Sequence, residues 1–304
     1  MTEINAQYIK QLEQEVKNLH EQNASIRSMH EMTTIYLKKL QDDLKQSEQK
    51  LLKLNKNLTD SINYAKHIQD AFTVQTGFLQ KLFPNSFIFQ KPKDIVSGDF
   101  AWAYEKNNET YIGVGDCTGH GVPGAMLSIF VISMLNQIVT IFDHVTSADI
   151  LDKLDKLMQK YLSQNTEKIK DSVEIALIKY DSINQTLLFS GANRPLIHVR
   201  NKTLTIYKGA KVVLGNPLRR KEYVKNVDIN IQKDDMLFMF SDGFADQFGG
   251  EKNTKFSTKR LLALIQDISE LTINEQYEQL KSTFFNWKGD NHQIDDVLLL
   301  GIRL

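Results

Sequence analysis

The stretch Tyr-Ile-Gly-Val-Gly-Asp-Cys-Thr-Gly-His-Gly at positions 111–121 decides the fold of this chain. Its first five residues have the aromatic and β-branched character of a short buried strand, which ends at Asp116. Glycines follow in the turn, and positions 122–141 then form a long, mostly apolar run that predicts a buried helix. The stretch therefore predicts a strand, a tight turn that carries a carboxylate, and a core helix.

Segments farther along the chain predict antiparallel hairpins. The expected strand pairs are 174–180 with 186–190, 196–200 with 203–207, and the segments 227–231 and 236–240 on either side of a turn at 233–235. Helices are expected near 258–268 and 274–286, and a closing strand over 297–302. Consecutive hairpins with separate helices favour an α+β layered domain over a doubly wound parallel sheet.

The first 76 residues have a different character, because all 15 glycines and all 5 prolines lie at or after position 77. From Ile9 to Leu58, eleven of fifteen positions spaced by three and four are apolar, which is typical of a coiled coil. Asn23 falls on this seam, where a buried asparagine favours a coiled coil of two helices. A polar residue that is merely tolerated there explains it equally well. We predict a dimerisation helix over 1–58 and a homodimer, with the orientation of the two helices left open.

After Leu58 the helical pattern continues with a different apolar face, formed by Ile62, Ala65, Ile68 and Phe72. No glycine or proline separates this segment from the seam, so a continuous helix would transmit movement. Residues 59–76 are therefore expected to be a helical linker that either switches the following domain or serves as a passive spacer.

Composition limits the classes of function. The 304 residues are 41% hydrophobic and 24% charged, which suits a globular protein with a core. The formal net charge is zero, which disfavours nucleic-acid or anionic-membrane partners. The sequence contains no run of 18 apolar residues and so predicts no membrane span, and the beginning of the chain lacks the apolar core of a signal peptide. The single cysteine, Cys117, cannot form an internal disulfide, so we expect a cytoplasmic protein.

Aspartates in turn-like settings carry the chemical signal. They are Asp99, Asp116, Asp242 and the pair Asp295 and Asp296, each beside an apolar strand-like stretch. A lone Asp-Gly is more often a turn than a ligand, but four such sites are harder to dismiss. Carboxylates that converge from several strand ends repel one another, and a hard divalent cation such as Mn²⁺ or Mg²⁺ resolves that repulsion.

Other active-site chemistries fit the sequence poorly. A thiolate zinc site needs more than one cysteine, and the glycine-rich stretch lacks the Gly-Lys-Ser/Thr ending of a P-loop. Cys117 has Pro123 where a cysteine phosphatase needs arginine, and the sequence contains no Gly-x-Ser-x-Gly elbow.

These residues, in this order, resemble the PPM-type metal-dependent protein serine/threonine phosphatases of the bacterial SpoIIE-like class. The matching stretches are 91–100, 113–128, 189–196, 240–247 and 295–304, and the segment 61–72 is similar to the linker that precedes this domain in many members. The resemblance covers essentially all of 77–304. It implies a four-layer αββα β-sandwich over 77–304, behind the N-terminal coiled-coil helix.

The resemblance also implies a site for two Mn²⁺ or Mg²⁺ ions. Asp116 would bridge the ions, and the backbone carbonyl of Cys117 would ligate one of them. The other implied ligands are Asp242 and Asp295 on the side of the closing strand and Asp99 on the other side, directly or through water. Asp296 would support the ligands or, if the register shifts by one, be the ligand itself.

The implied reaction is the hydrolysis of phosphoserine or phosphothreonine on a regulatory protein, of the anti-sigma-factor-antagonist kind. A water activated between the two ions would attack phosphorus. His120 would protonate the leaving oxygen or only order the glycine loop. Arg194 could help to bind phosphate, although a surface salt bridge is the commoner role of such an arginine.

Two positions depart from the usual pattern of the family: Ala101 stands where an aromatic is usual, and Leu298 where threonine is usual. They give mild support to the alternative of a catalytically weak coiled-coil scaffold that binds phosphoprotein. A phosphodiesterase or nucleotide hydrolase with the same metals is a third option, which the neutral charge disfavours.

Overall fold

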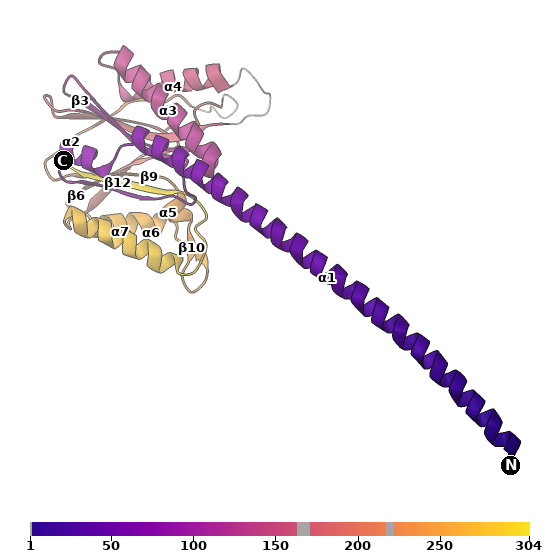
Figure 1. Ribbon diagram of the computed structural model, residues 1–304. Helices are drawn as coiled ribbons and strands as arrows, with labels where there is room; N and C mark the ends of the chain where they lie inside the picture. Colours follow the sequence, from indigo (N-terminus) through magenta and orange to yellow (C-terminus); the bar gives the residue numbers. More distant parts are fainter. Residues whose placement is uncertain (1, 163–170, 217–221) are drawn as a thin grey trace. The chain divides into compact units, whose positions relative to one another are not determined.

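The computed structural model describes residues 2–162, 171–216 and 222–304. The chain divides into two compact units, Met1–Ser61 and Ile62–Leu304. Helix α1 (Thr2–Phe72) is a single helix of 71 residues, as the absence of glycine and proline predicts (Figure 1). Every residue from 5 to 58 is exposed in the single chain, including the leucines of the predicted seam. This apolar stripe therefore has no partner within its own unit.

The second unit contains two five-stranded antiparallel sheets. The first sheet has the order β2 (Asp99–Lys106), β3 (Glu109–Cys117), β4 (Val173–Asp181), β5 (Thr186–Ala192) and β8 (Val227–Ile229). The second sheet has the order β1 (Ser86–Lys91), β12 (Val297–Arg303), β9 (Met236–Phe240), β6 (Leu196–Arg200) and β7 (Thr203–Tyr207). A short ribbon pairs β10 (Phe248–Gly249) with β11 (Thr254–Lys255).

Helices cover the outer face of each sheet. On the first sheet lie α3 (Gly121–Ile141) and α4 (Ser147–Leu162), and on the second lie α6 (Thr258–Ile268) and α7 (Ile273–Lys288) (Figure 1). Two short helices complete the unit: α2 (Thr76–Leu82) precedes β1, and α5 (Gly243–Asp246) follows β9. Three apolar clusters fill the space between successive layers. The predicted four-layer αββα sandwich is confirmed.

The two residues that depart from the family pattern lie in the layer between the sheets. Ala101 and Leu298 are both buried there, in the same cluster as Ile112 and Val114. Neither side chain faces the sheet edge where the predicted site residues lie, so their effect is on packing between the sheets.

The structure corrects one element of the sequence reading. Segments 227–231 and 236–240 do not form a hairpin, because β8 pairs with β5 in the first sheet whereas β9 pairs with β6 and β12 in the second. The turn between them therefore crosses from one sheet to the other. Strands β1 and β2 and helix α4 are elements that the sequence pattern did not predict.

One helix in the described part of the chain, α3, is long and apolar enough to cross a membrane by length and composition. Half of its apolar stretch is buried inside the domain. Val131, Ile132 and Leu135 pack in the cluster between this helix and the first sheet. Helix α3 is therefore a core helix of this domain, as its position after the glycine-rich turn predicts.

Candidate active site

The predicted site residues converge at one edge of the sandwich, where strands of both sheets end. Asp116 is the penultimate residue of β3, Asp242 follows β9, and Asp295 precedes β12. These three carboxylates line one pocket of about 270 Å³, together with Cys117 and His120 from the turn before α3. The two-sheet topology thus brings together positions that are far apart in the sequence.

Asp99 and Asp296 are almost fully buried and do not line this pocket. Asp99 lies opposite Asp116 in the β2–β3 register. The carboxylate of Asp296 accepts hydrogen bonds from the backbone N–H of Lys93 at 2.8 Å and of Gly98 at 2.7 Å. Of the two candidates at the closing strand, Asp295 faces the pocket, whereas Asp296 holds the loop that precedes β2.

The loop at Gly98 packs tightly against the glycine-rich turn. A Cβ atom at position 98 would lie 2.6 Å from the carbonyl oxygen of Gly119, which only glycine avoids. This contact fixes the backbone that leads into Asp99, which lies opposite Asp116 in the β2–β3 register.

Mutual repulsion and burial raise the pKa values of the clustered carboxyls. Burial raises the pKa of Asp116 to about 7, with Arg194 acting against it and the charges of Asp242 and Asp295 adding to it. Burial and the charge of Asp116 raise the pKa of Asp99 well above its usual range. Burial also raises the pKa of Asp295. This edge therefore carries more negative charge than its surroundings compensate.

Arg194 differs from the surface residue that the sequence favours. It is only 8% exposed. Its Nη2 atom contacts Asp116, Oε2 of Glu174 at 3.0 Å and Oδ2 of Asp242 at 3.0 Å. Glu174 lies opposite Asp116 on the neighbouring strand β4 and was missed in the sequence. Only the strand register brings it to the site, and sequence spacing gives no signal of that register.

His120 lies at the rim of the pocket, just before α3 begins. Its side chain is about half exposed, and its Nδ1 atom lies 2.8 Å from Oδ2 of Asp94. Asp94 is a second residue that the sequence analysis missed. Burial raises the pKa of the Cys117 thiol, and this side chain packs in the apolar cluster beneath α3. The side chain of Cys117 therefore takes no part in pocket chemistry.

The oxygen donors of the pocket fit a hard divalent cation. Arg194 contacts the Oδ2 atoms of Asp116 and Asp242, which leaves their Oδ1 atoms for other ligands. The Oδ2 atom of Asp99 is buried without a hydrogen-bond partner in the described part of the chain. Among these described residues, however, no group of three or more His, Cys, Asp or Glu is arranged to hold a metal ion as it stands. The chemistry of the oxygen donors thus fits, although the carboxylates at this edge are not close enough together to form a complete ligand group among the described residues.

Comparisons with known proteins agree with this architecture. The sequence model of the family Stage II sporulation protein E (SpoIIE) matches residues 106–304. The SiaA-PP2C domain of Pseudomonas aeruginosa is 28% identical in sequence and superposes with a TM-score of 0.75, covering 82% of this chain and 98% of that one. No curated protein sequence matches.

Two more distant solved structures share the fold. The PP2C phosphatase domain with a regulatory fragment of SpoIIE from Bacillus subtilis is 17% identical, with a TM-score of 0.57 over 72% of this chain and 62% of that one. The RsbU and RsbW domains of Rv1364c from Mycobacterium tuberculosis are 16% identical, with a TM-score of 0.57 over 73% of this chain and 60% of that one.

Proposed function

Because this chain belongs to the SpoIIE family of PP2C-type serine/threonine phosphatases, we propose that it hydrolyses phosphoserine or phosphothreonine on a regulatory protein, with Mn²⁺ or Mg²⁺ as cofactor. The observation that carries this proposal is the single pocket that Asp116, Asp242 and Asp295 share with Arg194. We propose a substrate of the anti-sigma-factor-antagonist kind. One structural neighbour contains RsbU and RsbW domains, which supports a regulatory partner of this type.

Asp116, Asp242 and Asp295 would hold two ions from the pocket side, with Asp99 and the carbonyl of Cys117 completing the ligand set. Such ions lower the pKa of a water molecule for attack on phosphorus and neutralise charge on the phosphoryl oxygens. RsbX, which has the same fold, was crystallised in complex with magnesium. The role of the protein in this chemistry is to position the metal ligands. Asp296 contributes by accepting hydrogen bonds from the backbone of the loop that leads to Asp99.

We propose His120 as the group that protonates the leaving serine or threonine oxygen. It lines the pocket, and Asp94 orients the ring through Nδ1, which leaves Nε2 for the substrate. In a His120→Gln variant the loss should be larger for a phosphoserine peptide than for an aryl phosphate, whose leaving group needs no proton. Equal losses on both substrates would mean that His120 only orders the glycine loop.

We further propose that a second copy of this chain covers the exposed seam of α1. The seam leucines are exposed along the first unit and recur with heptad spacing, which suits a two-stranded coiled coil. Sedimentation of the full chain should give a dimer, and Leu44→Asp should shift it towards monomer. A cytoplasmic location without nucleic-acid or membrane partners is proposed from the neutral charge and the single buried cysteine.

The function is tested by measuring phosphate release from a phosphoserine peptide with Mn²⁺ and with EDTA. Turnover that needs the metal supports the phosphatase. Peptide binding without turnover at any Mn²⁺ or Mg²⁺ concentration would instead favour the scaffold, in which the coiled coil carries the function.

A further inference from the structure

Arg194 lies deeper in the candidate active site than an arginine that pairs at the surface would. Its side chain contacts Asp116, Glu174 and Asp242 and lines the same pocket as these three carboxylates. Removing a guanidinium from water is costly, and the carboxylates compensate that cost here. Of the described residues that line this pocket, Arg194 alone carries a permanent positive charge.

The backbone around Arg194 is held from two sides. Asn193 has a left-handed conformation, with φ of 57°, and its Nδ2 atom donates to Oε1 of Glu174 at 2.6 Å. Its backbone N–H donates to the carbonyl of Ala210 at 2.8 Å. A Cβ atom at Gly191 would lie 2.3 Å from the carbonyl oxygen of Arg194, so this close approach requires glycine. The arginine is therefore presented to the pocket from a fixed position.

The hydrogen-bond donors of Arg194 are only partly used by the protein. All three carboxylate contacts fall on Nη2, and Nε is buried without a partner in the described part of the chain. Arg200 behaves differently, because its Nε and Nη2 both bond to the carboxylate of Asp235, at 2.8 and 2.7 Å. That bidentate pair is the usual geometry of a structural arginine. Arg194 forms no such pair, which leaves donor capacity for a group that enters the pocket.

We propose that Arg194 binds the phosphoryl group of the substrate and stabilises the negative charge on its oxygens during hydrolysis. The other charged residues that line the pocket are carboxylates, which repel phosphate. A guanidinium presents several donors in a plane and matches the oxygens of a phosphoryl group. This inference rests on the proposed phosphatase function and adds the residue that recognises the phosphoryl group. Arg194 donates hydrogen bonds only, and no covalent bond to it forms or breaks.

The test measures the binding of inorganic phosphate to the full chain by calorimetry, with and without Mn²⁺, and the binding of Mn²⁺ alone. Arg194→Met should weaken phosphate binding about 10- to 100-fold, as expected for the loss of charge-assisted hydrogen bonds. Arg194→Lys keeps the charge but loses the planar donors, so it should fall between Arg194→Met and the wild type. In the peptide assay, Arg194→Met should lower kcat/KM roughly 100- to 1000-fold.

Arg200→Met is the matched control, since it removes a partly exposed, ion-paired arginine from β6 without touching the pocket. It should lower the melting temperature and leave phosphate binding unchanged. The proposal is overturned if folded Arg194→Met binds phosphate as the wild type does, or if it loses phosphate binding only in proportion to a loss of Mn²⁺ binding. If Arg194→Met does not fold, wild-type phosphate affinity in Arg194→Lys overturns the proposal instead.

The same measurements separate this inference from the proposed function. A wild-type chain that binds phosphate through Arg194 but never hydrolyses the phosphopeptide contradicts the phosphatase and leaves the assignment of Arg194 intact. A chain that hydrolyses the peptide with unchanged kcat/KM in Arg194→Met contradicts the assignment and leaves the phosphatase intact.

Discussion

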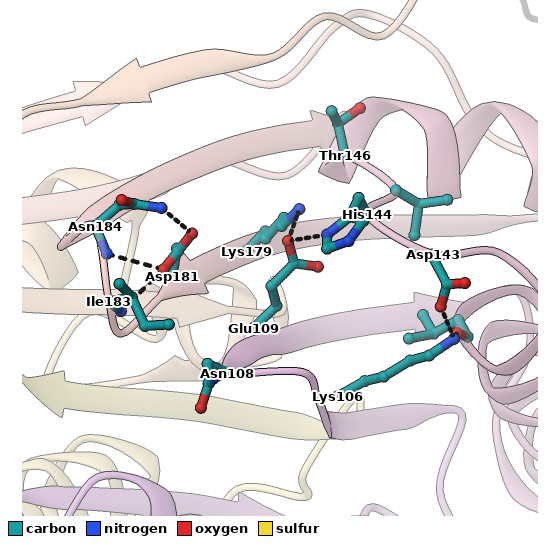
Figure 2. A network of polar contacts seen from close by, with 12 residues as sticks. Lys106, Asn108, Glu109, Asp143, His144, Thr146, Lys179, Asp181, Ile183 and Asn184 are labelled. Carbon is teal, nitrogen blue, oxygen red and sulfur yellow. Dashed lines mark hydrogen bonds and ion pairs between the residues drawn. The ribbon is translucent and has the colours of Figure 1, made fainter.

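The two ends of strand β3 carry carboxylates in opposite electrostatic situations. At its first residue, Glu109 pairs with Lys179 at 2.8 Å and His144 at 3.1 Å (Figure 2). It also accepts a hydrogen bond from the hydroxyl of Tyr111 at 2.6 Å. Burial opposes ionisation of Glu109, yet the hydrogen bonds from Lys179 and Tyr111 lower its pKa. Near the other end, Asp116 shares one arginine with Glu174 and Asp242.

This difference distinguishes Glu109, a carboxylate that stabilises the fold, from the carboxylates around Asp116, whose charges the protein does not balance. The charges around Glu109 are balanced within the protein, so this end needs no further ion. The charges around Asp116 are in surplus, and the raised pKa of Asp116 records the resulting repulsion. One strand thus combines a balanced end with an end that gains stability only when a cation binds.

The strongest way to break the comparison is to remove the charge of Asp116. Asp116→Asn should lower Mn²⁺-dependent phosphopeptide hydrolysis by about 1000-fold or more, because the proposed bridging ligand is lost. The fold should persist, since ionised Asp116 is itself unfavourable at this edge. Activity assays and thermal unfolding of the same preparation test both parts. Near-normal turnover in a folded variant would contradict the binuclear site.

At the Glu109 end of β3, a substitution should lower stability and leave activity unchanged. Lys179→Met leaves the buried carboxylate of Glu109 without its main cationic partner and should lower the free energy of unfolding by about 2–3 kcal/mol. Hydrolysis per folded molecule should stay at the wild-type rate, because Glu109 begins β3 and Lys179 lies opposite Tyr111 on β4, at the other end of the strand from Asp116. Urea unfolding and a metal-dependent assay measure the two quantities. A large loss of activity without loss of stability would mean that the two ends are coupled.

The pH dependence of stability should distinguish the two ends without any mutation. The pKa of Asp116 is about 7 in the folded chain, far above that of an unfolded aspartate, so the folded form keeps a proton that the unfolded form releases. In EDTA, the free energy of unfolding should therefore fall by about 1 kcal/mol per pH unit from pH 5 to 7 and then level off. Glu109 contributes no slope there, since its lowered pKa affects stability only in more acidic solution.

Saturating Mn²⁺ should flatten this slope, because a bound cation keeps the carboxylates ionised. In EDTA, Asp116→Asn should make the slope smaller, and Asp99 and Asp295, whose pKa values are also raised, account for the part that remains. Chemical denaturation at pH 5, 6, 7 and 8 measures the slope. Equal slopes in the wild type and in Asp116→Asn would show that Asp116 is not the group that titrates.

Much of this architecture could be predicted from local patterns, whereas the partners of the aspartates could not. The strand before Asp116, the core helix after it and the two hairpins follow from apolar periodicity and turn residues. Glu174 and Asp94 reach the site through strand register and loop packing, which a single sequence does not encode in its spacing. Arg194 is buried, whereas a surface salt bridge was the favoured expectation, because arginine is usually exposed and only the two-sheet topology buries this one.

In the linker, too, the local sequence pattern did not predict which residue contacts the domain. Ile68 and Phe72 were expected to belong to an apolar face different from the seam, and they are 40% and 41% exposed. Counted onward from Leu58 in steps of three and four, both positions continue the heptad seam instead of leaving it. The residue of the α1 terminus that is buried in the domain is a polar one, Gln69, which apolar periodicity cannot find.

The smallest predicted effect concerns Gln69, which connects the end of α1 to the loop before β2 and to α3. Its Nε2 atom donates to the carbonyl of Ser97 at 2.6 Å and to Oγ of Ser128 at 2.8 Å, and its Oε1 accepts from the N–H of Ser97 at 3.1 Å. Ser97 lies two residues before Asp99, in the loop that Asp296 also holds. Gln69 therefore gives the linker a direct contact with the backbone that positions a proposed metal ligand.

If residues 59–76 act as a switch, Gln69→Ala should change the Mn²⁺ concentration needed for half-maximal activity by about three- to tenfold, the usual size of coupling between adjoining elements. The dimer should persist, because the seam is untouched. Ile68→Ser is the matched control: it alters the neighbouring position of the same helix, which is 40% exposed and continues the seam, so its effect should fall on association and not on metal dependence. Titrations of activity and calorimetric Mn²⁺ binding, with sedimentation alongside, separate these effects. An unchanged Mn²⁺ titration in a folded, dimeric Gln69→Ala protein would reduce the linker to a tether, and the charge surplus at Asp116 would then be set by the two sheets alone.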